Sequence, residues 1–221
     1  MRQFFDYDVY VFDCDGVLLD SNTIKIDAMK SALASIKGVI AGRDECVEVF
    51  KRNFGSTLEQ HMNRFFDDCL TLDHNADAAE LRDSLIKKYM SHVDQRDPNA
   101  EILPMAETVL QRISAPCFVA SGAEVGQLRK VLKTVGLIKY FEGVFGAPEK
   151  KIEVLGRLRT KFQDKSNFVM VGDAIADFNA AEANDFDFFG VTKFSNAPHE
   201  LRRLCNEPYS KVVYDWVELV K

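Results

Sequence analysis

The sequence predicts an α/β fold in which a Rossmann-like parallel sheet carries an inserted all-helical cap domain. Short, continuous apolar runs recur along the chain, and amphipathic segments of helical length separate these runs from residue 104 onward. One long stretch after the first run contains no such apolar run. Continuous apolar runs are typical of strands buried on both faces, and their alternation with helices predicts parallel βαβ units in an open sheet.

The apolar runs are the predicted strands of the sheet. They are rich in β-branched and aromatic residues, and Gly, Pro or Asp bounds most of them. In chain order they span residues 9–12, 117–120, 144–145, 168–171 and 186–191.

The stretch between residues 22 and 97 is predicted to be helical. Its apolar residues fall into sets spaced i, i+3, i+4, the pattern of an amphipathic helix. These sets run from Ile24 to Leu33, Cys46 to Phe50, Leu58 to Phe66 and Leu81 to Tyr89. Ser56 and Thr57 are candidate caps of the third helix, with Glu59 or Gln60 reaching back.

This pattern divides the chain into two domains. We expect a core domain of residues 1–20 and 98–221, and a helical cap domain inserted at residues 21–97. Two short linkers, near Asp20-Ser21 and Pro98, are expected to join them.

Composition narrows the classes of function. With 28 basic and 34 acidic side chains the net charge is −6, which argues against a nucleic-acid partner because phosphate backbones require clustered cations. Five scattered cysteines form no CxxC pair, which indicates reduced thiols. No apolar run approaches the ~20 residues that span a bilayer, and the start of the chain lacks a signal-peptide apolar region. We expect a cytoplasmic protein with no membrane partner, as a monomer or weak dimer.

Carboxylates follow two of the predicted strands. Asp13 and Asp15 come directly after the first strand, and Asp173 and Asp177 follow the strand at 168–171. Buried carboxylates are costly unless something binds them, and ligands gather at the carboxyl ends of parallel strands. Mg²⁺ prefers such oxygen ligands together with a substrate phosphate. Taken singly, Asp13, Asp15 and Asp173 have an alternative interpretation as turn or helix caps, and Asp177 as a solvated charge on a helix.

Two further segments carry groups suited to an anion. Ser121 and Gly122 end the strand at 117–120, just before a helical segment, where a hydroxyl and backbone N–H groups suit phosphate. Ser121 alone is more often a helix cap. Lys150 and Lys151 stand at a helix start, which is unfavourable to the helix dipole and indicates a use for at least one ammonium.

Taken in order, these motifs resemble those of the haloacid dehalogenase superfamily, and the resemblance covers nearly the whole chain. Residues 13–21 match its first motif, residues 119–121 its second, Lys150 or Lys151 its third, and residues 171–173 with Asp177 its fourth. Residues 128–145 resemble the linker of the branch that contains β-phosphoglucomutase and phosphoglycolate phosphatase, which uses a helical insert as a cap.

The resemblance implies a Mg²⁺-dependent phosphatase that hydrolyses a small phosphate monoester, such as a sugar phosphate or a phosphoglycolate-like metabolite. Asp13 would be the nucleophile that forms an aspartyl-phosphate, and Asp15 the general acid and base. Mg²⁺ would bind Asp13, the backbone carbonyl of Asp15 and Asp173, with Asp177 holding the metal's water shell or ligating it directly. Ser121, Gly122 and the motif lysine would cradle the phosphoryl oxygens.

The sequence departs from the family pattern at two places. The motif lysine lacks its usual neighbouring proline turn, and we favour Lys151 because Ile152, Val154 and Leu155 begin the supporting helix, while Lys150 stays open. Mutase-like relatives carry a histidine near the position of Lys25, which weakens a phosphomutase interpretation.

Other activities on the same fold remain alternatives. Relatives that remove halide lack the second aspartate of the first motif, so Asp15 favours phosphoryl transfer. A phosphonate hydrolase needs a lysine that forms a Schiff base, for which Lys25, Lys37 and Lys51 are candidates. A non-enzymatic binding module would be expected to have lost part of the motif set, which is intact here.

Residues of the cap are expected to read the rest of the substrate. The candidates are Asn22, Lys25, Lys51 and Arg52, and residues 51–56 are expected to form a loop over the site. Lys51 and Arg52 would meet a negatively charged part of the substrate. The alternative is a solvated helix end with favourable cations at its C-terminus.

Overall fold

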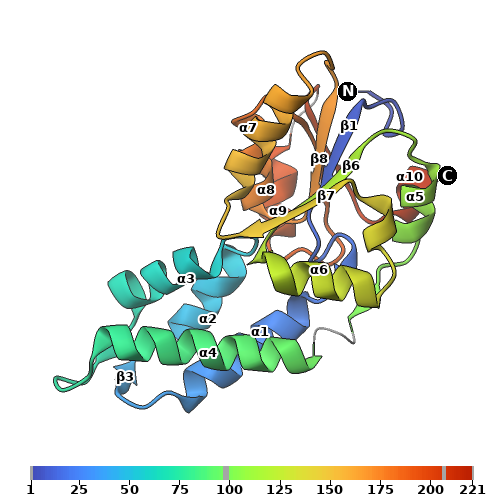
Figure 1. Cartoon of the computed structure of the whole chain (residues 1–221). Helices are drawn as coiled ribbons and strands as arrows, with labels where there is room; N and C mark the ends of the chain where they lie inside the picture. The colour runs from blue at the N-terminus through green and yellow to red at the C-terminus, as the bar shows by residue number, and fades with distance from the viewer. Residues whose placement is uncertain (1, 97–99, 206–207, 221) are drawn as a thin grey trace.

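A computed structural model describes residues 2–96, 100–205 and 208–220, and its centre is a parallel sheet of six strands (Figure 1). The strand order is β10-β9-β8-β1-β6-β7. The strands are β1 (Val9–Phe12), β6 (Cys117–Glu124), β7 (Gly143–Ala147), β8 (Phe168–Gly172), β9 (Asp187–Val191) and β10 (Ser210–Val213). The sheet confirms the predicted fold class. The sequence pattern did not predict β10, whose short Ser-Lys-Val-Val run forms an edge strand.

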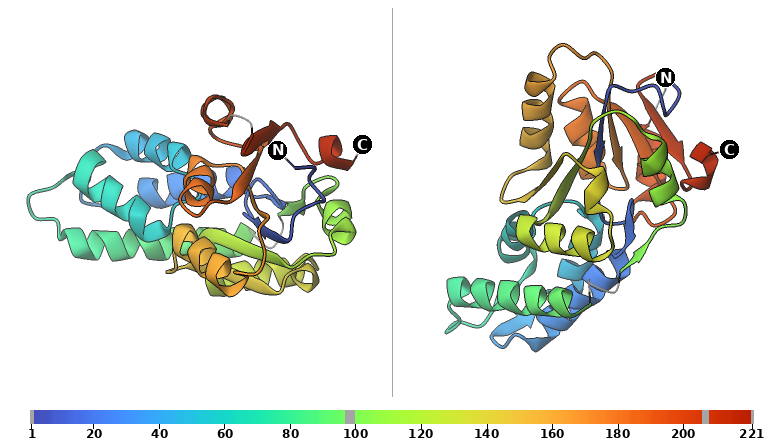
Figure 2. Two further views of the ribbon diagram at one scale, coloured as in Figure 1. Left: turned by 90° about the horizontal axis from the view of Figure 1, so that it is seen from above. Right: turned by 45° about the vertical axis from the view of Figure 1, so that its right-hand side comes forward.

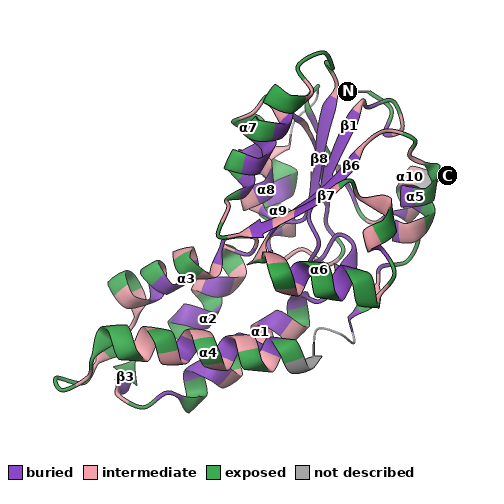
Figure 3. Ribbon diagram, in the orientation of Figure 1, coloured by how far each residue is buried: buried purple, intermediate pink, exposed green. Residues whose placement is uncertain are grey.

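Helices cover both faces of the sheet, and the alternation of side chains along β1 shows how. Tyr10 and Phe12 pack into one apolar cluster with residues of α5 (Ala106–Arg112) and α6 (Val125–Thr134). Val9 and Val11 pack into a second cluster on the other face. That second cluster draws on α7 (Lys151–Lys161), α8 (Ile175–Glu182) and α9 (Pro198–Leu204). Every residue of β1 is therefore buried, as Figure 3 shows for the central strands.

A second group of helices lies to one side of the sheet (Figures 1 and 2). We call it the helical segment; it consists of α1 (Asn22–Ser35), α2 (Arg43–Arg52), α3 (Leu58–Arg64) and α4 (Ala78–Arg96). It has an apolar cluster of its own, with Met29, Phe50 and Phe65 at its centre. Thr57 caps α3 in a capping box with Gln60, because each side chain accepts from the other's backbone N–H.

The helical segment contains two features that its periodicity did not predict. A short antiparallel pair joins β3 (Val39–Ala41) to β4 (Thr71–Leu72), and a π-helical turn at Phe65–Cys69 extends α3. Gly42, with a φ of 93°, allows the pairing because a side chain there would clash with the carbonyl of Cys69.

Two short strands connect the sheet to the helical segment. β2 (Leu19–Asp20) pairs antiparallel with β5 (Glu101–Ile102), so the outgoing and returning chain lie side by side. The first expected linker falls at this pair, whereas the second, at Pro98, lies outside the described residues. Among the described helices, none combines the length and apolarity required to cross a bilayer.

Candidate active site

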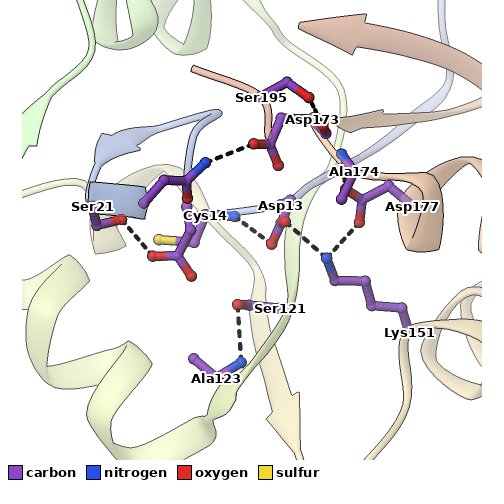
Figure 4. Close-up of polar contacts among 12 residues, drawn as sticks. Asp13, Cys14, Ser21, Ser121, Ala123, Lys151, Asp173, Ala174, Asp177 and Ser195 are labelled. Atoms are coloured by element: carbon purple, nitrogen blue, oxygen red, sulfur yellow. Dashed lines mark hydrogen bonds and ion pairs between the residues drawn. The ribbon is translucent and has the colours of Figure 1, made fainter. Parts of the chain in front are cut away.

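The strands β1, β6 and β8 are neighbours in the sheet; Asp13 and Asp173 directly follow β1 and β8, and Ser121 lies in the carboxyl-terminal half of β6. Their carboxyl ends place Asp13, Ser121 and Asp173 at one edge, where Figure 4 shows them together with Lys151 and Asp177. All five side chains are buried. The order of the strands thus brings together residues that lie far apart in the sequence.

Asp13 occupies the middle of this group. Its Oδ1 accepts a hydrogen bond from the backbone N–H of Cys14 at 2.7 Å, and its Oδ2 lies 2.8 Å from Nζ of Lys151. Burial raises the pKa of Asp13 to about 7; the ammonium of Lys151 opposes the shift, and the carboxylates of Asp177 and Asp15 add to it. Asp13 is therefore a carboxylate whose charge requires compensation by neighbouring cations.

Lys151 supplies one such cation from the first residue of α7. Its Nζ contacts the carboxylates of both Asp13 and Asp177. Burial lowers the pKa of Lys151, but the two carboxylates outweigh burial and the net shift is upward, so the side chain is an ammonium at neutral pH. Lys150 precedes the helix and is exposed. Of the two lysines left open by the sequence, the structure places Lys151 at the site.

Two residues, Asn22 and Ser195, form hydrogen bonds to Asp173. Asn22 Nδ2 donates a hydrogen bond to Oδ2 of Asp173 at 2.8 Å, and the hydroxyl of Ser195 donates one to its backbone carbonyl. Burial raises the pKa of Asp173 well above its ordinary value, with further contributions from Asp13 and Asp177. Gly16, at a φ of 73°, permits this packing, because a side chain there would clash with the Asp173 carboxylate.

The buried carboxylates have the composition of a site for a hard cation. One oxygen of each of Asp13, Asp173 and Asp177 lies within 4.8 Å of the others. Among the described residues, Oδ1 of Asp173 has no hydrogen-bond partner. Three like charges in a buried place are unfavourable unless a cation joins them. Carboxylate oxygens are the ligands that Mg²⁺ prefers, so the residues fit this ion.

Asp177, like Asp13 and unlike Asp173, has both its oxygens engaged. Oδ1 contacts Lys151, and Oδ2 accepts from the backbone N–H of Ala174 at 3.1 Å. In this arrangement Asp177 positions the lysine and closes the first turn of α8.

Asp15 lies beyond Asp13 in the loop after β1. The hydroxyl of Ser21 donates to its Oδ1 at 2.5 Å, and Lys25 forms an ion pair with its Oδ2. Burial raises the pKa of Asp15, but Lys25, Ser21 and Lys151 together outweigh it, so the net shift is downward. Asp15 is therefore ionised in this arrangement.

Ser121 and Gly122 lie within β6, where this strand meets the loop between α2 and α3. The hydroxyl of Ser121 accepts from the backbone N–H of Ala123 at 3.2 Å, and Glu124, not Ser121, caps α6. A side chain at Gly122 would clash with the carbonyl oxygens of Gly55 and Ser56. The loop between α2 and α3 therefore touches the core beside Ser121, as expected for residues 51–56.

A cavity of about 360 Å³ lies between this loop and the sheet edge. Asp13, Asp15 and Lys25 line it together with Gly122. The remaining lining comes largely from the helical segment and is mostly apolar: Phe50, Phe54, Leu58, Ile86, Tyr89 and Met90. The side chain of Lys25, one of the expected substrate contacts, thus reaches the cavity.

The other expected substrate contacts lie elsewhere. Lys51 pairs with Glu48 at 2.6 Å, Arg52 is exposed and donates to the Glu48 backbone, and neither is among the described residues that line the cavity. The physical reason is the orientation of α2, which turns Phe50 inward and its terminal cations outward. Asn22 does not line the cavity either, because its amide nitrogen is committed to Asp173 and the carbonyl of Phe194.

Sequence reasoning missed three residues of the site. Ser21 ends the first motif without an assigned role, and in the structure it donates to Asp15. Ser195 holds the backbone of Asp173, and His61 lines the cavity from α3. The Ser-Asn-Ala-Pro run before α9 marks Ser195 as a turn residue, but no local signal points to Asp173.

Comparisons with known proteins agree with this geometry. A family model described as haloacid dehalogenase-like hydrolase matches residues 7–185. Among solved structures, the chain is similar to a protein from Clostridium acetobutylicum described as a predicted phosphatase, with a TM-score of 0.72 and 18% identity over 97% of this chain and 96% of that one. No curated protein matches the sequence significantly.

Two further structures share the fold. A haloacid dehalogenase-like family hydrolase from Streptococcus pneumoniae gives a TM-score of 0.71 and 18% identity over 97% of each chain. A protein from Haemophilus somnus, described as a predicted phosphoglycolate phosphatase, gives 0.63 and 16% identity over 84% of this chain and 85% of that one.

Proposed function

Because the chain belongs to the haloacid dehalogenase-like hydrolase family, we propose that it is a Mg²⁺-dependent phosphatase that hydrolyses a small phosphate monoester through an aspartyl-phosphate on Asp13. The observation that carries the proposal is the buried Asp13 carboxylate, which opens onto the cavity between Lys151 and Asp15. A carboxylate held beside a cation and an acid/base group is the arrangement that nucleophilic phosphoryl transfer requires.

The first step transfers the phosphoryl group to Asp13. The carboxylate oxygen of Asp13 attacks phosphorus, the bond from phosphorus to the leaving oxygen breaks, and that oxygen takes the electron pair. Protonated Asp15 gives its proton to the leaving alkoxide. Lys151 and the hydroxyl of Ser121 stabilise charge on the transferring phosphoryl oxygens, as preorganised donors do.

The second step releases phosphate, restores the Asp13 carboxylate and returns Asp15 to its protonated form. Ionised Asp15 takes a proton from water, the water oxygen attacks phosphorus, and the bond from phosphorus to the Asp13 oxygen breaks. Asp15 is then protonated for the next cycle. Lys25 and Ser21 support its ionised form between the two steps, which fits the downward shift of the pKa of Asp15.

Mg²⁺ would be held by Asp13, Asp173 and the backbone carbonyl of Asp15, with Asp177 beside them. When bound, the ion offsets the repulsion between the Asp13 carboxylate and the phosphoryl oxygens. The unpartnered Oδ1 of Asp173 supports this assignment.

We further propose that residues 21–97 act as a cap domain on a core of residues 1–20 and 98–221. The separate apolar cluster of the helical segment supports this division, as does the contact of Gly55 and Ser56 with Gly122. As part of the same proposal the enzyme acts in the cytoplasm, because all five cysteines are free thiols, which is typical of a reducing compartment.

The alternatives have less support. A phosphonate hydrolase needs a lysine free to form a Schiff base, but Lys25 is engaged with Asp15, and Lys37 and Lys51 are not among the described residues that line the cavity. A binding module without activity gains no support from a motif set whose members meet at one edge of the sheet.

The proposed function is tested by phosphate release from acetyl phosphate and phenyl phosphate with Mg²⁺. We expect turnover by the natural sequence, loss of turnover in Asp13→Asn, and unchanged turnover in Asp164→Asn, whose side chain is exposed on the surface. Equal turnover in Asp13→Asn and Asp164→Asn would overturn the proposal.

A further inference from the structure

Apart from Lys25, which contacts Asp15 at the base of the cavity, the described residues that the helical segment contributes to the cavity wall are mostly apolar and include no cation. We propose that the alcohol part of the substrate is uncharged and largely apolar, of the benzyl or branched alkyl class, and carries no second anionic group. This inference rests on the proposed function and narrows its substrate class. It differs from the phosphoglycolate-like substrate that the family resemblance implied.

The apolar character of the wall comes from three elements. Phe50 lies in the last turn of α2, Phe54 and Leu58 lie in and after the following loop, and Ile86, Tyr89 and Met90 stand on one face of α4. Aromatic and aliphatic side chains in this position gain free energy by removing apolar substrate surface from water. The wall also contains Ser56 and Thr57, but Thr57 Oγ1 is hydrogen-bonded to Gln60 and Ser56 Oγ accepts from Arg64, so a hydroxyl-rich sugar finds few partners for its hydrogen bonds.

The charged groups around the cavity also favour a substrate whose alcohol part is uncharged. Among the described residues that line it, Lys25 is the cation, and it lies at the base in contact with Asp15. The other charged groups are carboxylates. Besides Asp13 and Asp15 they are Glu59, which is exposed, and Glu124, which accepts from two backbone N–H groups of α6. A second anion on the substrate would therefore be desolvated beside carboxylates without a cation to pair with.

His61 does not supply the missing charge. It lines the cavity from α3, but its ring is buried against Phe50 and Phe65. Burial lowers the pKa of His61 to about 3, and the nearby charge of Arg64 contributes, so the imidazole is neutral at neutral pH. Lys51 and Arg52 also leave the wall uncharged, because both contact Glu48 outside the cavity.

The size of the cavity suits a small alcohol. Its volume of about 360 Å³ falls near the lower end of the range for small-molecule sites, which is about 300–1,000 Å³. A phosphoryl group and one ring-sized group fit this space.

The test compares two substrates with matched leaving groups, benzyl phosphate and para-carboxybenzyl phosphate, with acetyl phosphate as a reference. The carboxylate is insulated from the scissile bond, so intrinsic reactivity is nearly equal. We expect kcat/KM to be higher for benzyl phosphate by about tenfold or more, because the extra carboxylate is desolvated without a partner.

A variant with a new cation should weaken this preference. Met90→Lys places an ammonium in the wall on an unbranched side chain of similar length, and it should reduce the benzyl to para-carboxybenzyl ratio by about fivefold or more. Ile40→Lys is the matched control, because Ile40 is 64% exposed on β3 and does not line the cavity; its ratio should equal that of the natural sequence.

The outcomes separate the inference from the function on which it rests. If acetyl phosphate and both esters resist hydrolysis, the proposed function fails and the inference fails with it. If acetyl phosphate is hydrolysed but para-carboxybenzyl phosphate is used as well as or better than benzyl phosphate, the inference alone is overturned. Because the substrate comparison uses the natural sequence, its result does not depend on the folding of any variant.

Discussion

The ammonium of Lys25 on α1 and the carboxylate of Asp15 after β1 form a buried ion pair, with side chains only 8% and 10% exposed. The pair joins the first helix of the helical segment to the loop that carries the proposed nucleophile. Asp15 has two protonation states in the proposed reaction. Lys25 stabilises the ionised form, and the protonated form gives its proton to the leaving group. Lys25 is in this sense a positioning residue for Asp15.

Removal of one partner from this pair should be costly for stability. We expect Lys25→Met to lower the free energy of unfolding by about 3–5 kcal/mol, because it leaves a buried carboxylate without its cation. Urea denaturation followed by circular dichroism measures this. Lys30→Met is the control on the same helix: Lys30 lies 3.8 Å from Asp27 in an exposed pair, so its loss should stay below about 1 kcal/mol. Equal losses in the two variants would contradict the structural role of the pair.

Asp15 should matter more for poor leaving groups than for good ones. We expect Asp15→Asn to slow hydrolysis of an alkyl phosphate by about 10²–10⁴, the usual contribution of general acid and base help. The loss should be smaller for an aryl phosphate, whose leaving oxygen needs less protonation. Steady-state kinetics with benzyl and para-nitrophenyl phosphate provide the comparison. An identical loss with both substrates would exclude the acid role.

Metal dependence should follow from the buried carboxylates. We expect activity to disappear in excess chelator and return with Mg²⁺, and Asp173→Asn to raise the Mg²⁺ concentration for half-maximal activity by about tenfold or more, because a ligand charge is lost. A titration of activity against Mg²⁺ measures this, with the surface variant Asp164→Asn as control. Full activity in excess chelator would show that the reaction needs no metal ion.

His61 should make stability depend on pH. Its pKa is lowered from 6.5 to about 3 by burial, so between these values the unfolded chain binds a proton that the folded protein does not. The free energy of unfolding therefore falls as pH falls through this window. Between about pH 6.5 and about pH 5, the natural sequence should lose about 2 kcal/mol more than His61→Phe.

Urea midpoints at several pH values test this prediction. The exposed His74 provides the control, because His74→Phe should retain the pH dependence of the natural sequence. The same slope in His61→Phe as in the natural sequence would show that other groups cause the pH dependence.

The position of the site was predictable because it depends on strand ends. Asp13, Ser121 and Asp173 each come at or just after the end of a buried apolar run, and parallel strands align their carboxyl ends at one edge. The choice of Lys151 over Lys150 was also within reach, since the apolar residues after it set the register of α7. These inferences needed only local patterns and one rule of topology.

Other features depend on long-range packing and could not be predicted in this way. Asn22 meets Asp173 only because the turn at Gly16 folds α1 back over the sheet edge. The pairing of β3 with β4 joins segments that have no local signal for each other. The outward orientation of Lys51 and Arg52 follows from how α2 packs against its neighbours, which the periodicity of a single helix does not determine.

The most direct test of the proposed nucleophile is to locate the phosphoryl group during turnover. The protein is mixed with acetyl phosphate and Mg²⁺, quenched in acid within the first turnover, treated with borohydride, and digested for mass spectrometry. Borohydride converts an acyl phosphate into an alcohol, so we expect homoserine at position 13 and unmodified Asp13 in the sample without substrate. Phosphate release with unmodified Asp13 at every quench time, or modification at another carboxylate, would contradict Asp13 as the nucleophile.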